Sequence, residues 1–586
     1  MLNPRIYRAA FLPVLVAVVV LAFSFRSEPG PLGTNLAPAA FNGQAAFNTL
    51  TNLGRHYPGR RPGSPGDNAL ADRVAADLGA PPIQFRVRKE YFGAGTAVGT
   101  RTVENVIAEQ TGSSSRRIVV IAHRDALHPG SPADLSGTAT MIELARVLAG
   151  RTLNRTVELV STSGSTGLAG ATHLAGSLGG PIDAVIVLGD VAGSRVAEPV
   201  VVPWSSGENM APLLLRSTAG AAVRAQAAIP PGGANLAAQF ARLAFPLTLS
   251  EQGPFNARGI PAVLLSRAGE RGPSTNTPVN EVDLASFGSA ALQTISALDA
   301  GPDIPPPAAY LTYKQMTVPL WPIRLLVLTL ILPVLCAAID AFARARRRGH
   351  EVGRWAGWVL ATALPFALAS LFVAALGAMG LVEVAAPGPV AAGTPANGGA
   401  VVEIAVAALV LVVAMFPIRA FIVRRIGPRG DPTGAGGGAA VLIVLCAISL
   451  VLWAANPFAA ALVVPALHLW MWIVAPEIRL RVPVTLALLL AGLAPIALVL
   501  LYYATQFGLG PAGVIWTGTL LIAGGGLGLP ALLEWSVVAG CAVSVAVIAA
   551  RSAGVAAPEP APVTVRGPIT YAGPGSLGGT KSALRR

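Results

Sequence analysis

The chain has 586 residues, of which 53% are hydrophobic and 12% are charged, and its formal net charge is +13. Soluble globular proteins carry about 25% charged residues, so the composition excludes a protein that is soluble throughout. Nearly all of the positive charge is arginine and much of it lies between apolar segments. This spread argues against nucleic-acid binding, which requires a concentrated basic patch.

The first segment, MLNPRIYRAAFLPVLVAVVVLAFSF, has a basic start followed by an apolar run over residues 9–25. No small-x-small cleavage pattern follows it, so residues 1–29 are predicted to be a signal anchor rather than a cleaved signal peptide. Arg5 and Arg8 place the N-terminus in the cytoplasm by the positive-inside rule. The domain that follows is therefore expected outside the membrane of the cell.

Residues 30–315 have the mixed composition of a globular domain, in which short apolar strands alternate with helices. This order predicts an α/β sandwich, a mixed sheet flanked by helices, whose ligands bind at the carboxyl ends of the strands. The domain contains no cysteine, so it forms neither a disulfide nor a cysteine-ligated metal site. The expected strands are 83–92, 104–112, 117–123, 156–162, 184–191 and 259–266, and the expected helices are 137–149, one from 167, and 282–299.

Residues 316–550 are predicted to form an all-α polytopic membrane domain of seven or eight helices. Arginine-rich loops after 340, 420 and 475 fall on the cytoplasmic side, whereas loops 382–400 and 506–512 lack Lys and Arg and fall outside. The Gly-rich segment 510–530 leaves a re-entrant or broken helix open, and with it the side of the tail. The expected spans are 319–340, 355–381, 401–420, 438–455, 458–475, 483–505, 513–530 and 534–550, and the tail 551–586 is expected to be disordered.

His468 is the one ionisable residue in the middle of a predicted span. Such residues suggest a functional role, here a transport pathway. Since no second intramembrane charge accompanies it, a neutral histidine bonded to a neighbouring helix is the favoured interpretation.

The stretch RRIVVIAHRDALHPGSPADLSG, residues 116–137, ends a β-branched run on His123 and Asp125. Together with GRRPGSPG (59–66), ENVIAEQTG (104–112), GLAGATHLA (167–175), LGDVAG (188–193) and SEQGPF (250–255), it resembles a known family. Over about 45–300 the chain is similar to the di-zinc aminopeptidases, which also include glutamate carboxypeptidase, transferrin receptor and nicastrin. The resemblance implies the α/β fold and a site with two zinc ions that share a bridging aspartate.

The resemblance also implies roles for residues of this chain. His123 and Asp190 match ligands of one metal, and Asp125 matches the neighbour that orients a ligand. The bridging aspartate falls at Ala133, so Asp134 is one residue out of register. One zinc ion held by His123, Asp134 and Asp190 is chemically feasible.

The other half of the site is missing. The family's general base falls at Gly164, and the ligands of the second metal fall at Ser165 and Asn276. Glu251 and Gln252 also replace an Asp-His pair. Because neutral Ser and Asn oxygens are poor zinc ligands, a second zinc is not expected. The remaining candidates for a base are His128 and His173, for which a surface or packing role is simpler.

We therefore expect a membrane-anchored, zinc-peptidase-like protein that is non-catalytic or impaired and binds a peptide or protein partner outside the membrane. The expected ligand site is the region of His123, Asp190 and Asn276. One alternative is an active metallo-aminopeptidase that uses one metal. Another is a transporter or a subunit of a membrane complex, supported only by His468 and segment 510–530. The sequence leaves substrate, partner and oligomeric state open.

Overall fold

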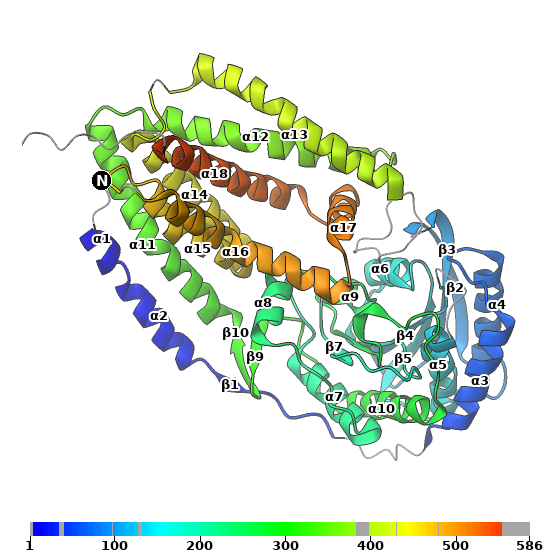
Figure 1. Ribbon diagram of the computed structural model, residues 1–586. Helices are drawn as coiled ribbons and strands as arrows, with labels where there is room; N and C mark the ends of the chain where they lie inside the picture. Colours follow the sequence, from blue (N-terminus) through cyan, green and yellow to red (C-terminus); the bar gives the residue numbers. More distant parts are fainter. Residues whose placement is uncertain are drawn as a thin grey trace, which may run out of the picture.

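The computed structural model describes residues 4–33, 40–96, 98–126, 132–382, 398–428, 430–478 and 480–553. Figure 1 shows a domain in which helices flank a β-sheet, and an elongated bundle of helices that extends from one side of it. From residue 554 on, the tail that was predicted to be disordered lies outside the described residues.

A seven-stranded mixed sheet forms the centre of the domain, with strand order β2-β3-β5-β4-β6-β8-β7. The four inner strands run parallel, while β2, β3 and β7 are antiparallel to their neighbours. This confirms the predicted α/β sandwich. The strands are β2 (Arg86–Thr96), β3 (Gly99–Gln110), β4 (Ser114–His123), β5 (Arg155–Thr162), β6 (Ile182–Leu188), β7 (Val201–Val202) and β8 (Ala262–Leu265).

Helices cover both faces of this sheet, because alternate side chains of a strand point to opposite sides. In β4, Ile118 and Val120 pack against one layer of helices, and Val119 and Ile121 pack against the other; all four are fully buried. The first layer contains α3 (Gly43–His56), α4 (Pro65–Gly79), α5 (Ser136–Leu148), α7 (Leu213–Ala227) and α10 (Glu281–Ala300). The second, which faces the bundle, contains α6 (Leu168–Ser177), α8 (Leu236–Ala244) and α9 (Gln252–Ala257).

Seven helices of the described chain are long and apolar enough to cross a membrane, which indicates a membrane protein. One is the N-terminal segment, formed by α1 (Pro4–Ala9) and α2 (Leu12–Ala22). The other six are α11 (Leu320–Arg347), α12 (Val352–Ala378), α13 (Gly398–Ile426), α14 (Ala435–Ala455), α16 (Val482–Phe507) and α18 (Leu529–Ala553).

Two of the predicted spans are shorter helices in the structure. Segment 458–475 corresponds to α15 (Pro457–Ile473), with 17 residues, and segment 513–530 corresponds to α17 (Pro511–Ala523), with 13. Of the alternatives left open for 510–530, the structure has a broken helix, because α17 ends before a Gly-rich turn. Thirteen residues rise only about 20 Å, less than the apolar thickness of a bilayer.

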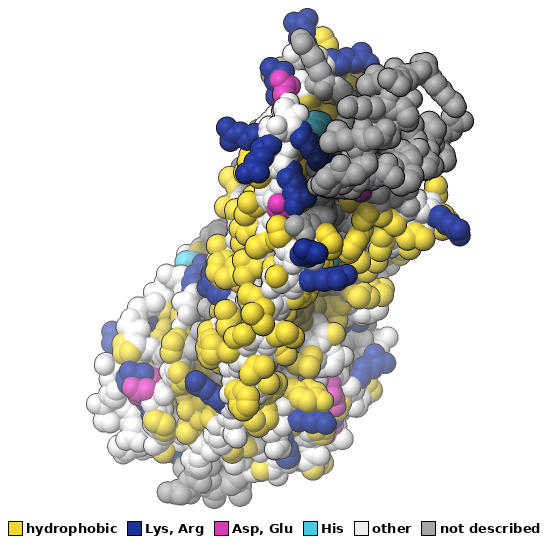
Figure 2. Space-filling model, turned by 90° about the vertical axis from the view of Figure 1, so that its left-hand side faces the viewer, with side chains coloured by type: hydrophobic (Ala, Val, Ile, Leu, Met, Phe, Trp, Pro, Cys, Tyr) yellow, Lys and Arg dark blue, Asp and Glu magenta, His cyan; other side chains and the backbone are white. Residues whose placement is uncertain are grey.

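Charge and hydrophobicity are distributed unevenly along the bundle. Figure 2 shows hydrophobic side chains over the middle of one face, and Lys and Arg gathered toward the end remote from the domain. The helices that end there carry basic last turns: Arg344, Arg346 and Arg347 in α11, and Arg424 and Arg425 in α13. This pattern is typical of a membrane-spanning bundle with one basic flank.

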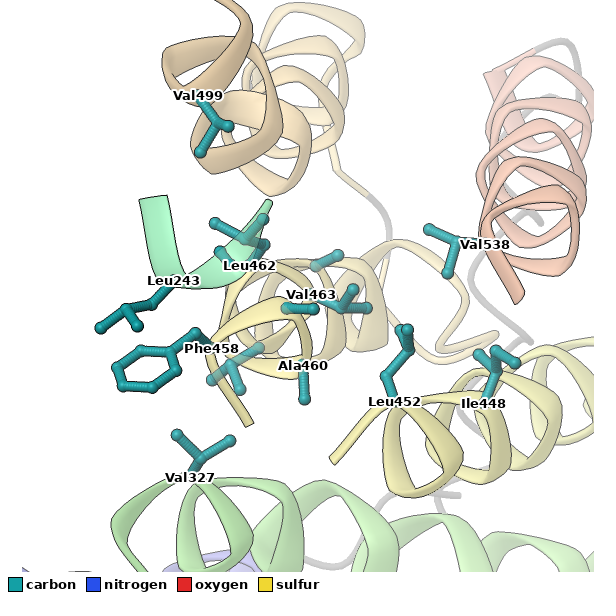
Figure 3. Close-up of a cluster of buried hydrophobic side chains, with 14 of the residues drawn as sticks. Leu243, Val327, Ile448, Leu452, Phe458, Ala460, Leu462, Val463, Val499 and Val538 are labelled. Atoms are coloured by element: carbon teal, nitrogen blue, oxygen red, sulfur yellow. The ribbon is translucent and has the colours of Figure 1, made fainter. Parts of the chain in front are cut away.

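The domain and the bundle share one buried core, and α8 makes the connection. Phe240 of α8 meets Phe458 of α15 edge to face, with ring centroids 5.4 Å apart. Leu243 lies beside Phe458 and Leu462 in Figure 3. Asn456, which caps the start of α15, donates its side-chain amide to the carbonyl of Leu243 at 2.8 Å. The domain is therefore packed directly on the membrane helices.

A second connection lies where the chain enters and leaves the domain. Strands β1 (Arg26–Ser27), β10 (Met316–Pro319) and β9 (Tyr310–Tyr313) form a small antiparallel sheet in that order. This sheet ties the segment after α2 to the start of α11.

His468 of α15 is bonded to two neighbouring helices. Its Nε2 lies 2.9 Å from the carbonyl oxygen of Leu330 in α11, and its Nδ1 lies 2.8 Å from the hydroxyl of Tyr7 in α1. A carbonyl only accepts, so Nε2 donates and Nδ1 accepts from Tyr7. This geometry is that of the bonded, structural histidine favoured from the sequence.

Candidate functional site

His123 stands at the centre of the predicted site, at the carboxyl end of β4. Its Nδ1 lies 3.3 Å from a carboxylate oxygen of Glu251, the residue directly before α9. Glu251 is buried and also accepts a hydrogen bond from the hydroxyl of Thr162, at the end of β5. One carboxylate thus joins the ends of two neighbouring parallel strands.

This arrangement fixes the charge of His123. Burial alone would lower its pKa, but the hydrogen bond with Glu251 and the charges of Glu251, Asp125 and Asp134 raise the pKa to about 9. At neutral pH the imidazole is therefore protonated. A protonated imidazole has no lone pair for a metal, so a metal must displace this proton before His123 can bind it.

Asp125 is fully buried and holds the loop after β5. Its two oxygens each accept a backbone N–H at 2.8 Å, from Thr166 and from Gly167. The four residues 164–167 all have positive φ, at 101°, 57°, 58° and 79°. Ser165 and Thr166 pay a steric cost for this conformation, which turns successive N–H groups toward one anion. Asp125 therefore binds the backbone of the two residues that follow Gly164 and Ser165.

The charge of Asp125 is also unusual. Burial and the negative charge of Asp67 raise its pKa to about 7.

Ala133 and Asp134, the two positions considered for the bridging aspartate, both lie in the 3-10 turn η2 (Pro132–Leu135). Ala133 is fully buried, whereas the side chain of Asp134 is 17% exposed and one of its oxygens lies 3.6 Å from Nη2 of Arg60. Burial raises the pKa of Asp134, and the charges of His123 and Arg60 oppose the rise. The carboxylate at 134 thus lies close to both cations.

Asp190 follows β6 and is 1% exposed. Its Oδ1 accepts the backbone N–H groups of Ala192 and Gly193, at 3.1 and 2.7 Å. Its Oδ2 is buried and has no hydrogen-bond partner within the described part of the chain. Burial raises the pKa of Asp190 to about 6. A buried carboxylate oxygen without a partner is costly, so this atom favours a bound cation or water.

Behind the site, Arg124 and Asp67 form a fully buried ion pair, with Nε 2.9 Å from Oδ1. Arg124 also donates to the carbonyls of Ser161 and Glu104, at 3.0 and 2.7 Å. Asp67 accepts from the hydroxyl of Ser163, at the start of the loop that binds Asp125. This pair ties the ends of β4 and β5 to the middle of β3.

The remaining predicted positions supply no ionisable side chain. Gly164 has none, Ser165 is half-buried, and Asn276 is exposed on a turn. Gln252 is buried and donates to the carbonyl of Trp204 at 3.1 Å. The positions at which the resemblance places a base and a second metal therefore carry no charged side chain.

Of the two candidate substitute bases, the structure describes His173, which packs away from the centre. His173 stacks on the ring of Phe92, with centroids 4.0 Å apart, and its Nε2 lies 3.9 Å from Glu90. This is the packing role that the sequence favoured. His128 lies outside the described residues.

The fit of a metal can be judged from these contacts. In the described ranges, no group of three or more His, Cys, Asp or Glu side chains could hold a metal ion. His123 is bonded to Glu251, and Asp134 faces Arg60. The side chains as arranged therefore do not fit a zinc ion, because the unpartnered oxygen of Asp190 supplies one ligand where three or four are needed.

Two residues of the site were not predicted for their roles. Arg60 is part of the RRPGSPG motif, and its guanidinium is buried beside Asp134. Glu251 was noted only as a replacement. One feature of the sequence could have indicated a role for Glu251 in the site: it retains a carboxylate where the family pattern has an Asp-His pair.

The domain that carries these residues is similar to known proteins. Residues 105–283 match the model of Peptidase family M28. No curated protein matches the chain.

Among solved structures, an aminopeptidase from Aneurinibacillus sp. strain AM-1 is 15% identical, covering 44% of this chain and 95% of its own, with a TM-score of 0.35. A zinc aminopeptidase from Bacillus subtilis is 13% identical, covering 46% and 95%, with a TM-score of 0.35. A glutaminyl cyclase from an Acidobacteriales bacterium is 20% identical, covering 45% and 97%, with a TM-score of 0.34.

Proposed function

We propose, from the Peptidase family M28 domain that residues 105–283 form, that this membrane protein is a non-hydrolytic relative of those peptidases. In this proposal the domain binds a peptide or protein partner at the carboxyl ends of β4, β5 and β6. The bundle and the N-terminal anchor hold it at the membrane.

The hydrogen bond between His123 and Glu251 carries the proposal. It gives the first expected metal ligand an internal partner and keeps it protonated at neutral pH. The position of the general base has no side chain, and general-base help is worth roughly 10²–10⁴-fold in rate. A site that lacks a base and a free imidazole can still bind a peptide or protein partner, because its surface shape and its charged side chains are retained.

One observation favours a second candidate, an aminopeptidase that uses a single metal. Oδ2 of Asp190 is buried and lacks a hydrogen-bond partner among the described residues. A zinc ion held by Asp190, with His123 and Asp134 turned toward it, would satisfy this oxygen. The metal would have to displace the proton of His123.

The proposed orientation places the N-terminus in the cytoplasm and residues 30–315 outside the cell membrane. It is supported by the basic last turns of α11 and α13, at the end of the bundle remote from the domain. Single cysteines placed at Arg195 and at Arg347 should react with an impermeant maleimide on intact cells only at position 195.

The test of function uses the full chain in lipid nanodiscs, because the domain core continues into the bundle. Zinc content is measured by mass spectrometry, and hydrolysis is followed on a mixture of unprotected peptides. We expect no zinc that depends on His123 and no hydrolysis, but retention of a subset of the peptides. Stoichiometric zinc, with hydrolysis lost in His123→Ala, would establish the one-metal enzyme instead.

A further inference from the structure

An apolar cavity of about 440 Å³ lies between the domain and the bundle. Helices α16, α17 and α18 form most of its wall, and residues Phe245 and Leu247 of the domain close one side. Its volume falls in the range of small-molecule sites in proteins. The lining is nearly all aliphatic or aromatic, with Val499, Phe507, Leu521 and Trp535 among its residues.

The cavity lies at the end of the bundle that adjoins the domain. Helix α16 ends at Phe507, which lines the cavity, and the hydroxyl of Tyr503 one turn earlier donates to the carbonyl of Phe245. If α16 crosses the bilayer along its length, as its hydropathy indicates, the cavity lies at the depth of the leaflet on the domain side. The hydrocarbon tails of that leaflet reach the same depth.

A cation stands beside the cavity. Arg271 is exposed and forms no ion pair or hydrogen bond with the described residues. Its guanidinium lies against the turn after α16: a Cβ on Gly508 would be 2.8 Å from Nη2 of Arg271. The next residue, Leu509, lines the cavity. A ligand in the cavity could thus place a negative group on Arg271.

A second polar group lies inside the cavity wall. Thr517 of α17 is 5% exposed, and its hydroxyl is buried with no hydrogen-bond partner among the described residues. Buried hydroxyls in proteins are normally bonded, so this one calls for an acceptor or donor from a ligand. An acyl ester offers a carbonyl oxygen next to its apolar chain.

We propose that this cavity binds one acyl chain of an anionic phospholipid from the domain-side leaflet, with the lipid headgroup on Arg271. The apolar wall takes the chain, the hydroxyl of Thr517 takes an ester oxygen, and the guanidinium takes the phosphate. The occupant is a membrane lipid because the cavity lies at leaflet depth and its cation has no partner in the described chain. This proposal does not depend on peptide binding.

Such a lipid would contact the segment that leads to the candidate site. After Phe245 and Leu247 in the cavity wall, the backbone N–H of Leu249 donates to Glu270 at 2.9 Å. Glu251, two residues further on, contacts His123.

The test uses the full chain in phosphatidylcholine vesicles that contain a little phosphatidylglycerol with a photoactivatable acyl chain. After illumination, labelled peptides are identified by mass spectrometry. We expect labels on α16, α17 and α18 at residues that line the cavity. A phosphatidylcholine probe with the same chains should label these residues roughly threefold to fivefold less. This ratio corresponds to the free energy of one exposed ion pair, the pair between the headgroup and Arg271.

Two substitutions, each with a matched control, decide the outcome. Gly518 lines the cavity and an added Cβ there meets nothing within 4 Å, so Gly518→Leu starts its side chain in open space of the cavity. In Gly518→Leu, labelling of the residues that line the cavity should fall by about tenfold or more, because the acyl chain and the added side chain would overpack the space. Gly357→Leu, at an equally open position of α12, should leave labelling unchanged.

Arg271→Gln should remove the preference for phosphatidylglycerol, and Arg195→Gln, at another exposed arginine, should retain it. Unchanged labelling in Gly518→Leu, or equal labelling by both lipids in the native chain, would overturn the proposal.

Discussion

Nε of Arg242, on helix α8 of the domain, donates a hydrogen bond of 3.0 Å to the hydroxyl of Tyr502 on membrane helix α16. The same guanidinium pairs with Glu270 and lies over the rings of Tyr503 and Phe507. The side chains of Arg242 and Glu270 are 2% and 1% exposed. A buried ion pair therefore forms part of the contact between the domain and the bundle.

Arg242→Leu should destabilise the full chain by about 3–5 kcal/mol, because it leaves the carboxylate of Glu270 buried without a counter-charge. The double variant Arg242→Leu/Glu270→Gln should regain part of this loss. Thermal unfolding in nanodiscs measures both. Arg224→Leu, at an exposed position of α7, is the control, and an equal shift in the two single variants would contradict the prediction.

The pair of His123 and Glu251 predicts a pH dependence. The folded pKa of His123 is about 9 and the unfolded value is about 6.5, so the native state binds the proton more tightly. The resulting stability is fully present below pH 6.5 and is lost as the pH rises through 9. Its size should be on the order of 1–3 kcal/mol.

Unfolding by denaturant at pH 6 and pH 9.5, with a chelator present, measures this effect. His123→Gln should reduce the difference between the two pH values, and Asp125, whose pKa is raised to about 7, should account for part of the remainder. Glu251→Gln should also reduce the difference, because the hydrogen bond and charge of Glu251 are the main causes of the raised pKa of His123. An undiminished difference in His123→Gln would assign it to other groups.

Restoring an acidic residue at the base position should not restore hydrolysis. Gly164 has φ of 101°, and a Cβ there would lie 2.6 Å from the Cβ of Ala169. A residue with a Cβ costs roughly 1–2 kcal/mol in this left-handed backbone conformation. Gly164→Glu should destabilise the chain by more than that, because of the added clash with Ala169. Gly150→Ala, with φ of 69° and open space, measures that backbone cost. Peptide hydrolysis in Gly164→Glu would show that the loop rearranges.

Tyr7→Phe should weaken the attachment of the N-terminal anchor to the bundle. It removes the hydrogen bond to His468 and leaves the ring contacts with Phe11 and Trp472 in place. Interhelical hydrogen bonds in membranes contribute about 0.6 kcal/mol on average, so the shift should be small. Cross-linking between cysteines at Tyr7 and His468 measures proximity; absence of the cross-link would contradict the docking.

Much of the fold could be predicted because it depends on local patterns. The β-branched runs at 117–123 and 156–162 form β4 and β5 almost as predicted, and the apolar periodicity after Ser136 forms α5. Side-chain alternation and helical period are properties of short segments. The Gly-rich composition of 510–530 left a broken helix open, but hydropathy does not separate a full span from a short apolar helix, so the end of α17 at Ala523 came from the structure.

The sequence by itself determined the α/β domain, the apolar helices, and the position of His123 at the end of a buried strand. Only the tertiary structure decided that Asp134 faces Arg60 while Ala133 is buried, and that Glu251 is the partner of His123. Glu251 and His123 are 128 residues apart. Contacts over that separation depend on the order of strands in the sheet and on how α9 packs beneath the bundle, and no local period encodes either.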